Sequence, residues 1–343
     1  MRKYLITFLL ASIFFPLFAQ QNSDSYKILF YNVENLFDTQ DDSLTNDEEF
    51  LPEGERFWNK HKYYSKLNNI YKVIVAIGGW SPPAIIGLCE IENRKVINDL
   101  VNNTPLNKFE YQIIHEESPD RRGIDVGLLY RKELFKPISY EAIPVNFPNN
   151  PESKTRDILY VKGIAKKNDT LNIFINHWPS RWGGQLESED RRLFVASVLK
   201  NKTDSIFKSN PESNIIITGD FNDYPDNKSI SSILNASQSF DMIESNHLYN
   251  LSSSLTKTSN IGTHKYQGDW GVLDQFIVSG SILYIQNKVF TTLNDIHIFN
   301  ADFLLEPDEG YYGYKPKRTF VGYKYNGGFS DHLPTYLILN FNK

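Results

Sequence analysis

The sequence predicts a mixed α/β fold in which helices cover the faces of β-sheets. Short runs of β-branched and aromatic residues recur along the chain between turn residues, and several are apolar almost throughout. Such runs are expected of strands that are covered on both faces. Segments with apolar residues at helical spacing fall between them. Because 41% of the 343 residues are hydrophobic, a sizeable core is available.

Nine runs are expected to form strands because they are short, rich in β-branched or aromatic residues, and bounded by turn residues. In chain order they are residues 26–32, 84–90, 110–115, 125–131, 158–165, 171–177, 214–220, 272–279 and 334–340.

Two segments are expected to form helices. Residues 58–77 place Leu67, Ile70 and Ile74 on one stripe and end at a Gly-Gly pair, which is a typical helix stop. Residues 186–199 show similar apolar spacing, with acidic residues in the first turn. Four polar or turn-rich segments are expected to be loops: residues 39–56, 144–155, 251–270 and 306–328.

The N-terminal segment has the pattern of a secretory signal peptide. Arg2 and Lys3 precede an apolar stretch that ends at Ala19, and polar residues follow. We expect residues 1–19 to be removed and the protein to be secreted or periplasmic. The alternative is that the segment remains as a membrane anchor.

Composition excludes some classes of site. The single cysteine, Cys89, allows no intrachain disulfide and no cysteine-based zinc site, and it is interpreted as a small buried hydrophobic residue. The formal net charge is −5, and loss of Arg2 and Lys3 would make it −7. That charge argues against strong sequence-independent nucleic-acid binding but leaves a locally basic cleft open. The sequence lacks a phosphate loop of the G-x-x-x-x-G-K-[ST] type, an H-E-x-x-H zinc motif and a G-x-S-x-G elbow.

Polar side chains recur where the expected strands end. Because strand ends gathered at one rim can form a site from distant parts of a chain, we expect these side chains to lie together. Carboxylates and amides without thiols suit a hard cation such as Mg²⁺, Ca²⁺ or Mn²⁺. The residues concerned are Asn32, Glu90, Asn176, His177, Asp220, Asn222, Asp274, Asp331 and His332.

Six stretches occur in a fixed order across residues 26–340: YNVEN, CEIEN, NHWPS, GDFND, LDQFIVS and SDHLP. Together they resemble the endonuclease/exonuclease/phosphatase superfamily, which includes deoxyribonucleases, abasic-site endonucleases, neutral sphingomyelinases and inositol polyphosphate 5-phosphatases. The resemblance implies a four-layer αββα sandwich, with two mostly antiparallel sheets packed face to face and helices outside. It also implies that residues 20–343 form a single catalytic domain that hydrolyses phosphoesters.

The resemblance implies a metal site on three residues. Glu90 matches the principal metal-binding glutamate, Asn32 matches the asparagine that supports the metal, and Asp331 is expected beside it. The expected cofactor is Mg²⁺, with Mn²⁺ or Ca²⁺ as alternatives.

The resemblance also implies a set of catalytic residues. Asp220 and Asn222 match the pair that orients the attacking water and the phosphate. His332 matches the final histidine of the family, and Asp274 matches the aspartate that forms a hydrogen bond with it. His177 matches the second histidine of the deoxyribonuclease-like branch, where it is assigned to acid–base chemistry.

Three further residues are assigned supporting roles. Arg156 and Asn176 are expected to face the substrate phosphate, although Arg156 could equally be a solvated charge. Asp125 is expected to orient His177 from the neighbouring strand.

Taken singly, several of these residues have simpler explanations. Asn32, Asp220 and Asn222 could be turn residues, since Asn and Asp favour turns. His177 could be a packed surface histidine. The number and order of the matching stretches favour the catalytic interpretation of the set.

The sequence favours a nuclease-type phosphodiesterase. The stretch GDWGVLDQF lacks the Cys and Arg that the inositol-phosphatase branch carries near its second aspartate. The Tyr-rich residues 310–325 could contact lipid, stack on bases or sugars, or form a plain surface hairpin.

The alternatives to a nuclease are a phosphatase or sphingomyelinase-like phospholipase, and a non-catalytic binding module of the same fold. The expected partner is a phosphoester substrate, with nucleic acid favoured; we expect a monomer without a stable protein partner.

Overall fold

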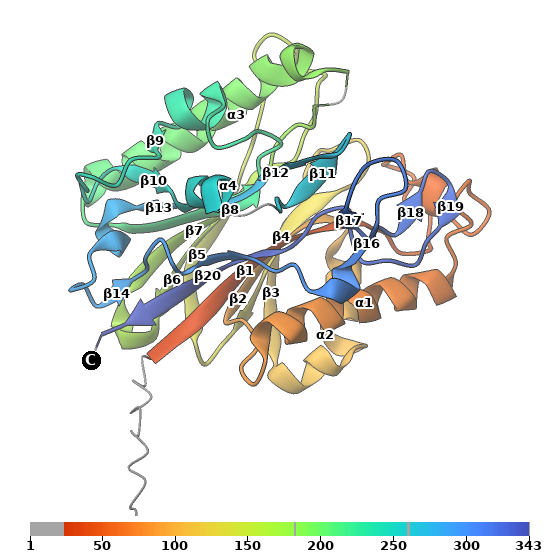
Figure 1. Cartoon of the computed structure of the whole chain (residues 1–343), viewed down its shortest axis with the longest axis horizontal. Helices are drawn as coiled ribbons and strands as arrows, with labels where there is room; N and C mark the ends of the chain where they lie inside the picture. Colours follow the sequence, from red (N-terminus) through yellow and green to blue (C-terminus); the bar gives the residue numbers. More distant parts are fainter. Residues whose placement is uncertain (1–23, 182, 259–260, 343) are drawn as a thin grey trace, which may run out of the picture.

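The fold has four layers, as the resemblance to the endonuclease/exonuclease/phosphatase superfamily implies. The structure, a computed structural model, describes residues 24–181, 183–258 and 261–342. Two large β-sheets pack against each other, with helices α1 and α2 outside one sheet and α3 outside the other (Figure 1).

The first sheet runs in the order β14-β20-β1-β2-β4-β3, and β15 also pairs with β20. β1 and β2 pair in parallel, whereas β20, β4 and β3 add antiparallel pairings. The strands are β1 (Asp24–Leu36), β2 (Ile85–Ile91), β3 (Tyr111–His115), β4 (Asp125–Arg131), β14 (Val289–Phe290), β15 (Ile296–Ile298) and β20 (Thr335–Phe341).

The second sheet runs in the order β5-β6-β7-β8-β13-β10-β9. Within it β7 and β8 are parallel, as are β9 and β10, and the remaining pairs are antiparallel. The strands are β5 (Phe135–Ile143), β6 (Ile158–Ala165), β7 (Thr170–His177), β8 (Asn214–Asp220), β9 (Ala236–Ser237), β10 (Leu248–Asn250) and β13 (Asp274–Ser279). Both sheets are therefore mostly antiparallel.

The helices cover the outer faces. Asn59 caps α1 by accepting a hydrogen bond from the Lys62 amide, and the helix ends where Gly79 takes a positive φ of 59°. The capping agrees with the preference of Asn for this position and of Gly for the helix end. The α-helices are α1 (Lys60–Gly78), α2 (Arg94–Asn102), α3 (Gln185–Ser209) and the short α4 (Leu255–Thr258).

The alternation of side chains between two buried faces explains why residues 28–31 of β1 are all apolar. Ile28 and Phe30 belong to the core between the two sheets, whereas Leu29 and Tyr31 pack under α1 and α2. At Gly87 in β2 the sheets approach closely, because a Cβ atom there would lie 2.7 Å from the Ile175 Cδ1 atom of β7. Strands buried on both faces carry the apolar runs that identified them.

Some elements differ from the sequence prediction. β5 was not expected, because it is an edge strand whose central side chains are largely exposed and which contains Pro137. α2 was not expected either, and α3 continues beyond residue 199 to Ser209. Two expected loops contain short strands: β11 (His264–Tyr266), β12 (Asp269–Gly271), β16 (Leu305–Pro307), β17 (Tyr314–Pro316), β18 (Phe320–Val321) and β19 (Lys324–Tyr325).

The expected signal peptide, residues 1–19, lies outside the described residues and remains a prediction. Among the residues that the structure describes, no helix is both long and apolar enough to cross a bilayer.

Candidate active site

The polar residues at the strand ends come together from both sheets. In the second sheet Asp220 of β8 is paired in register with His177 of β7 on one side and with Asp274 of β13 on the other. In the first sheet Asn32 of β1 is paired with Cys89 of β2. Glu90 is the next residue of β2 and therefore lies close to Asn32. Hydrogen bonds between side chains then join the two sheets.

Asn32 connects two carboxylates. Its Nδ2 atom lies 3.2 Å from Glu90 Oε1 and 3.1 Å from Asp220 Oδ2, and its Oδ1 accepts a hydrogen bond from the Glu34 amide at 2.9 Å. The Asn35 amide donates to the other Glu90 oxygen at 2.9 Å. Glu90 has a positive φ of 60° where the pairing of β2 shifts register, and this bulge turns its side chain toward the other carboxylates.

Asp220 is a buried carboxylate with an unusual titration. Burial raises its pKa to about 7, and the neighbouring charges of Asp274 and Glu90 act in the same direction, although His332 opposes them. The Asn222 amide donates to Asp220 Oδ1 at 2.9 Å, and Asn222 itself adopts a positive φ of 50°. A carboxylate that titrates near neutrality can accept a proton from water at physiological pH.

His332 and Asp274 form the expected pair. The Nδ1 atom of His332 lies 2.7 Å from Asp274 Oδ2, and its Nε2 atom lies 3.8 Å from Asp220 Oδ2. Burial alone would lower the pKa of His332, but Asp274 and Asp220 outweigh it and raise that pKa well above its ordinary value. His332 therefore lies between two carboxylates that favour its protonated form.

His177 lies on the other side of Asp220 from Asp274. Its Nε2 atom is 3.8 Å from Glu90 Oε1 and 3.7 Å from Asp220 Oδ2. Burial, followed by the positive charges of Arg156 and Arg122, lowers the pKa of His177 well below its ordinary value. The pKa values of the two histidines are therefore shifted in opposite directions.

Asp125 does not orient His177, so this sequence prediction is wrong. Its Oδ2 atom lies 3.0 Å from His115 Nε2, and its Oδ1 accepts a hydrogen bond from the Ser118 amide at 2.8 Å. The Nδ1 atom of His177 has no hydrogen-bond partner among the described residues. The carboxylate of Asp125 is instead bound by His115, which lies on the adjacent strand β3.

Asn176 is also placed differently from the prediction. It is fully buried, donates to the Thr218 carbonyl at 3.2 Å and accepts from Trp178 Nε1 at 3.2 Å. One end of its amide thus joins β7 to β8 and the other binds the residue just after β7, so the side chain packs rather than facing a phosphate.

Arg156 supports the segment that carries His177. Its guanidinium donates to the carbonyl oxygens of His177 at 3.2 Å and Trp178 at 2.6 Å, and it forms an ion pair with Asp120 at 2.9 Å. Only 5% of Arg156 is exposed. Its predicted contact with a substrate phosphate remains a prediction, because two of its five N–H groups are not used in these bonds.

Sequence reasoning missed a group of charges around Asp331. Arg318 donates to Asp331 Oδ2 at 3.0 Å and to Glu34 Oε1 at 2.9 Å. Lys66 is buried on the other side of Glu34, where its Nζ atom donates to the Phe329 carbonyl at 2.6 Å. Burial lowers the pKa of Lys66 to about 8. The only signal in the sequence was that Glu34 lies inside the YNVEN stretch.

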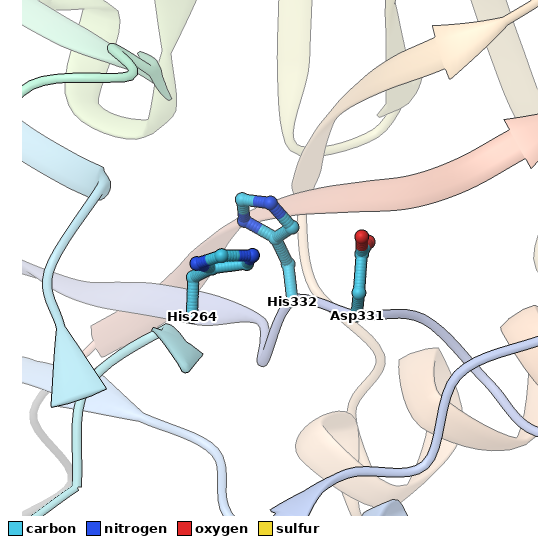
Figure 2. Close-up of side chains that lie close together, drawn as sticks. All are labelled: His264, Asp331 and His332. Carbon is cyan, nitrogen blue, oxygen red and sulfur yellow. The ribbon is translucent and has the colours of Figure 1, made fainter. Parts of the chain in front are cut away.

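A third histidine, His264, was also missed. It lies on β11, forms an isolated β-bridge with His332, and its ring centroid is 4.8 Å from that of His332 (Figure 2). Burial, followed by the charge of His332, lowers the pKa of His264 to about 4. Ligand atoms of His264, Asp331 and His332 lie within 4.8 Å of one another, as do those of Asp220, Asp274 and His332.

The donor set fits a hard divalent cation. Glu90 and Asp220 are brought close by the amide of Asn32, and close carboxylates repel each other unless a cation or a proton lies between them. Burial is the main cause of the raised pKa of Asp220, and the charges of Asp274 and Glu90 add to it. Oxygen ligands without thiols are those that Mg²⁺ and Mn²⁺ prefer.

The fold and the motifs agree with comparisons to known proteins. A family model described as the endonuclease/exonuclease/phosphatase family matches residues 27–341. No sequence among curated proteins matches the chain.

Solved structures share the fold at low sequence identity. TDP2 of D. rerio, humanized by 14 mutations, is 15% identical, with 93% of this chain and 100% of that chain covered and a TM-score of 0.57. TDP2 of D. rerio complexed with single strand DNA product is 14% identical, with 92% and 99% covered and a TM-score of 0.56. A mannosyl-6-phosphatase of Bacteroides thetaiotaomicron is 13% identical, with 92% and 100% covered and a TM-score of 0.55.

Proposed function

The chain belongs to the endonuclease/exonuclease/phosphatase family, and from that premise we propose that it is a divalent-metal-dependent hydrolase of phosphodiester bonds in nucleic acid. The observation that carries the proposal is the His332–Asp274 hydrogen bond of 2.7 Å, formed beside the carboxylates of Asp220 and Glu90. A buried imidazolium next to a carboxylate that titrates near neutrality can stabilise a phosphoryl oxygen while the carboxylate accepts a proton from water.

Glu90 would hold the cation, with Asn32, which contacts it, and Asp331 as the supporting residues that the family resemblance implies. When bound there, a divalent cation would neutralise charge on the phosphoryl and leaving oxygens. The protein side chains supply the remaining functions. Asp220 accepts the proton of the attacking water, because its pKa of about 7 lies close to the working pH.

The two histidines have different functions in this proposal. His332 keeps its proton, and Asp274 fixes its Nδ1–H, so its Nε2–H is available to a phosphoryl oxygen. His177 is neutral, and its Nε2 atom lies on the Glu90 side of Asp220, where it contacts a second oxygen of the phosphate. An anionic phosphate thus meets one positive and one neutral donor.

Nucleic acid is the substrate that the observations favour. The arrangement of His177 and His332 resembles the deoxyribonuclease-like branch, and a similar fold is known with a single strand DNA product in TDP2 of D. rerio. Arg318 adds a cation at the rim of the site. A phosphatase of the same family is the second candidate, because a mannosyl-6-phosphatase has a similar fold.

A substrate panel tests the proposal. Purified protein is incubated with supercoiled plasmid, a single-stranded oligonucleotide, sphingomyelin and a sugar phosphate, each with Mg²⁺ and with EDTA. We expect Mg²⁺-dependent cleavage of the nucleic acids, and a parallel preparation of His332→Ala controls for contaminating nucleases. Turnover of the sugar phosphate or sphingomyelin without nucleic-acid cleavage would contradict the nuclease assignment but not metal-dependent hydrolysis.

We also propose that the protein is exported, supported by the charged start and apolar run before Ala19. Protein recovered from its host should begin near Gln20 when its mass is measured. A protein that retains Met1 would contradict export by cleavage. The proposed monomeric state is checked by light scattering.

A further inference from the structure

A basic cavity lies beside the catalytic residues and is not used by the mechanism above. It has a volume of about 710 Å³ and lies between the segment before β4, the segment before β6, the residues after His177, and α3. That volume lies within the range of small-molecule sites. Its charged lining comprises Asp120, Glu152 and five cations: Arg121, Arg122, Lys154, Arg156 and Arg191.

The two carboxylates do not balance these cations. Asp120 is shared, since its Oδ2 atom lies 2.9 Å from Arg156 and its Oδ1 atom 3.7 Å from Arg122. Glu152 accepts a hydrogen bond from Arg121 through its carbonyl oxygen, at 3.1 Å, rather than through its carboxylate. The lining therefore carries more positive than negative charge.

Arg191 is held in place with an unused donor. Its guanidinium lies 5.3 Å from the ring centroid of Phe147, and its buried Nε atom has no hydrogen-bond partner among the described residues. Burial, followed by the charge of Arg156, lowers the pKa of the Arg191 guanidinium. Cations packed close together are stabilised by an anion.

The cavity adjoins the reaction centre through Arg156. This side chain lines the cavity and donates to the carbonyl oxygens of His177 and Trp178. The charge of Arg122, on another wall, is close enough to help lower the pKa of His177. An anion in the cavity would thus lie near a phosphate held by His177.

We propose that the cavity binds a second phosphate of the substrate, next to the phosphate that is hydrolysed. The inference rests on the proposed phosphodiesterase function and assigns a substrate class to it: phosphoesters with at least two phosphates. Guanidinium groups suit this ligand, because their planar donors bind phosphate oxygens in pairs. The second phosphate comes either from the next nucleotide of a strand or from a small molecule with two phosphates.

Matched substrate pairs test the cavity and distinguish its two sources. The pairs are the thymidine dinucleotide TpT against the trinucleotide TpTpT, and glucose 6-phosphate against glucose 1,6-bisphosphate. KM and kcat are measured with Mg²⁺ for the wild type, Arg122→Ala and Arg191→Gln. We expect each variant to raise KM about tenfold more for the two-phosphate member of a pair, because a hydrogen bond between charged groups is lost.

A control variant separates local from general charge effects. Lys132 pairs with Glu110 at 3.2 Å, is well exposed, and follows the opposite end of β4 from the segment that lines the cavity. Lys132→Ala also removes one positive charge. It should leave the ratio of KM values for the two members of each substrate pair unchanged. A selective effect on TpTpT indicates a strand, and one on the bisphosphate indicates a small molecule. Equal effects on both members of each pair would overturn the proposal.

A binding measurement decides the question even if no substrate is turned over. Pyrophosphate is titrated calorimetrically into the wild type, Lys132→Ala and the double variant Arg122→Ala/Arg191→Gln, in EDTA so that no cation contributes. We expect affinity to fall at least tenfold in the double variant alone. Equal affinity in all three proteins would overturn the cavity assignment, whereas absence of turnover with retained pyrophosphate binding would contradict only the proposed function.

Discussion

The His332–Asp274 pair gives the sharpest test of the proposed chemistry. The changes are His332→Ala, Asp274→Asn and the double variant. Nδ1 of His332 lies 2.7 Å from Asp274 Oδ2, and both side chains are buried, so little solvent screens the interaction. A hydrogen bond between charged groups contributes about 1.5–3 kcal/mol, so Asp274→Asn should lower kcat by roughly 10- to 150-fold.

Loss of the histidine should be more damaging than loss of the aspartate. His332→Ala removes both the charge and the donor that faces the phosphate, and a fall of about 10²- to 10⁴-fold in kcat is expected. Because Asp274 acts through His332, the double variant should be within about twofold of His332→Ala. The assay is turnover of bis(p-nitrophenyl) phosphate at saturating Mg²⁺, which needs no particular nucleic-acid contact.

A matched substitution controls for the loss of one carboxylate. Asp204 is exposed on α3 and pairs with Lys200 one turn away. Asp204→Asn should leave kcat unchanged. If the losses from Asp274→Asn and His332→Ala multiply in the double variant, the two residues act independently and the proposed pairing in catalysis is refuted.

Three further predictions follow from the site and the core. Glu90→Gln should weaken Mg²⁺ or Mn²⁺ binding sharply in a calorimetric titration, because it removes a ligand charge while keeping the shape; unchanged affinity would rule out Glu90 as the main ligand. The pKa of Lys66 is about 8 in the folded protein, against an ordinary value of 10.5. Between these two pH values Lys66 is protonated in the unfolded chain and neutral in the folded protein. The stability of the wild type relative to Lys66→Met should therefore increase from pH 8 to pH 10.5, by about 3 kcal/mol in total. Denaturant unfolding at both pH values checks this, and a difference that does not change with pH would contradict the shift. Gly87→Ala places a Cβ atom 2.7 Å from Ile175 Cδ1 between the sheets and should destabilise the fold by about 1–3 kcal/mol through overpacking. An unchanged melting temperature would show that the Ile175 side chain moves aside without cost.

Several of the strands that were predicted correctly are buried on both faces. β1, β4 and β8 carry continuous apolar runs because one set of alternate residues packs between the sheets and the other under the helices. β5 lacks this signal, since it lies at the edge of its sheet with its central side chains exposed. Exposed edge strands need little apolar periodicity, so sequence patterns do not identify them.

The site residues at strand ends were predictable, whereas their partners were not. Asn32 and Asp220 meet across 188 positions of sequence, and Arg318 reaches Glu34 across 284. Contacts between residues so far apart along the chain leave no local pattern in the sequence. The incorrect assignment of Asp125 has a similar cause: β3 places His115 against it, and the choice between two histidines depends on sheet packing rather than on spacing.

The central claim is that the carboxylates and histidines at these strand ends hydrolyse a phosphoester with the help of a divalent cation. The most direct measurement is phosphorus NMR of bis(p-nitrophenyl) phosphate turnover in water labelled with heavy oxygen, with Mg²⁺ and with EDTA. We expect one labelled oxygen in the phosphate product of the wild type with Mg²⁺, no product with EDTA, and product formation about 10²- to 10⁴-fold slower from His332→Ala. Turnover that persists in EDTA, or a product without the label, would contradict metal-dependent attack of water on phosphorus at this site.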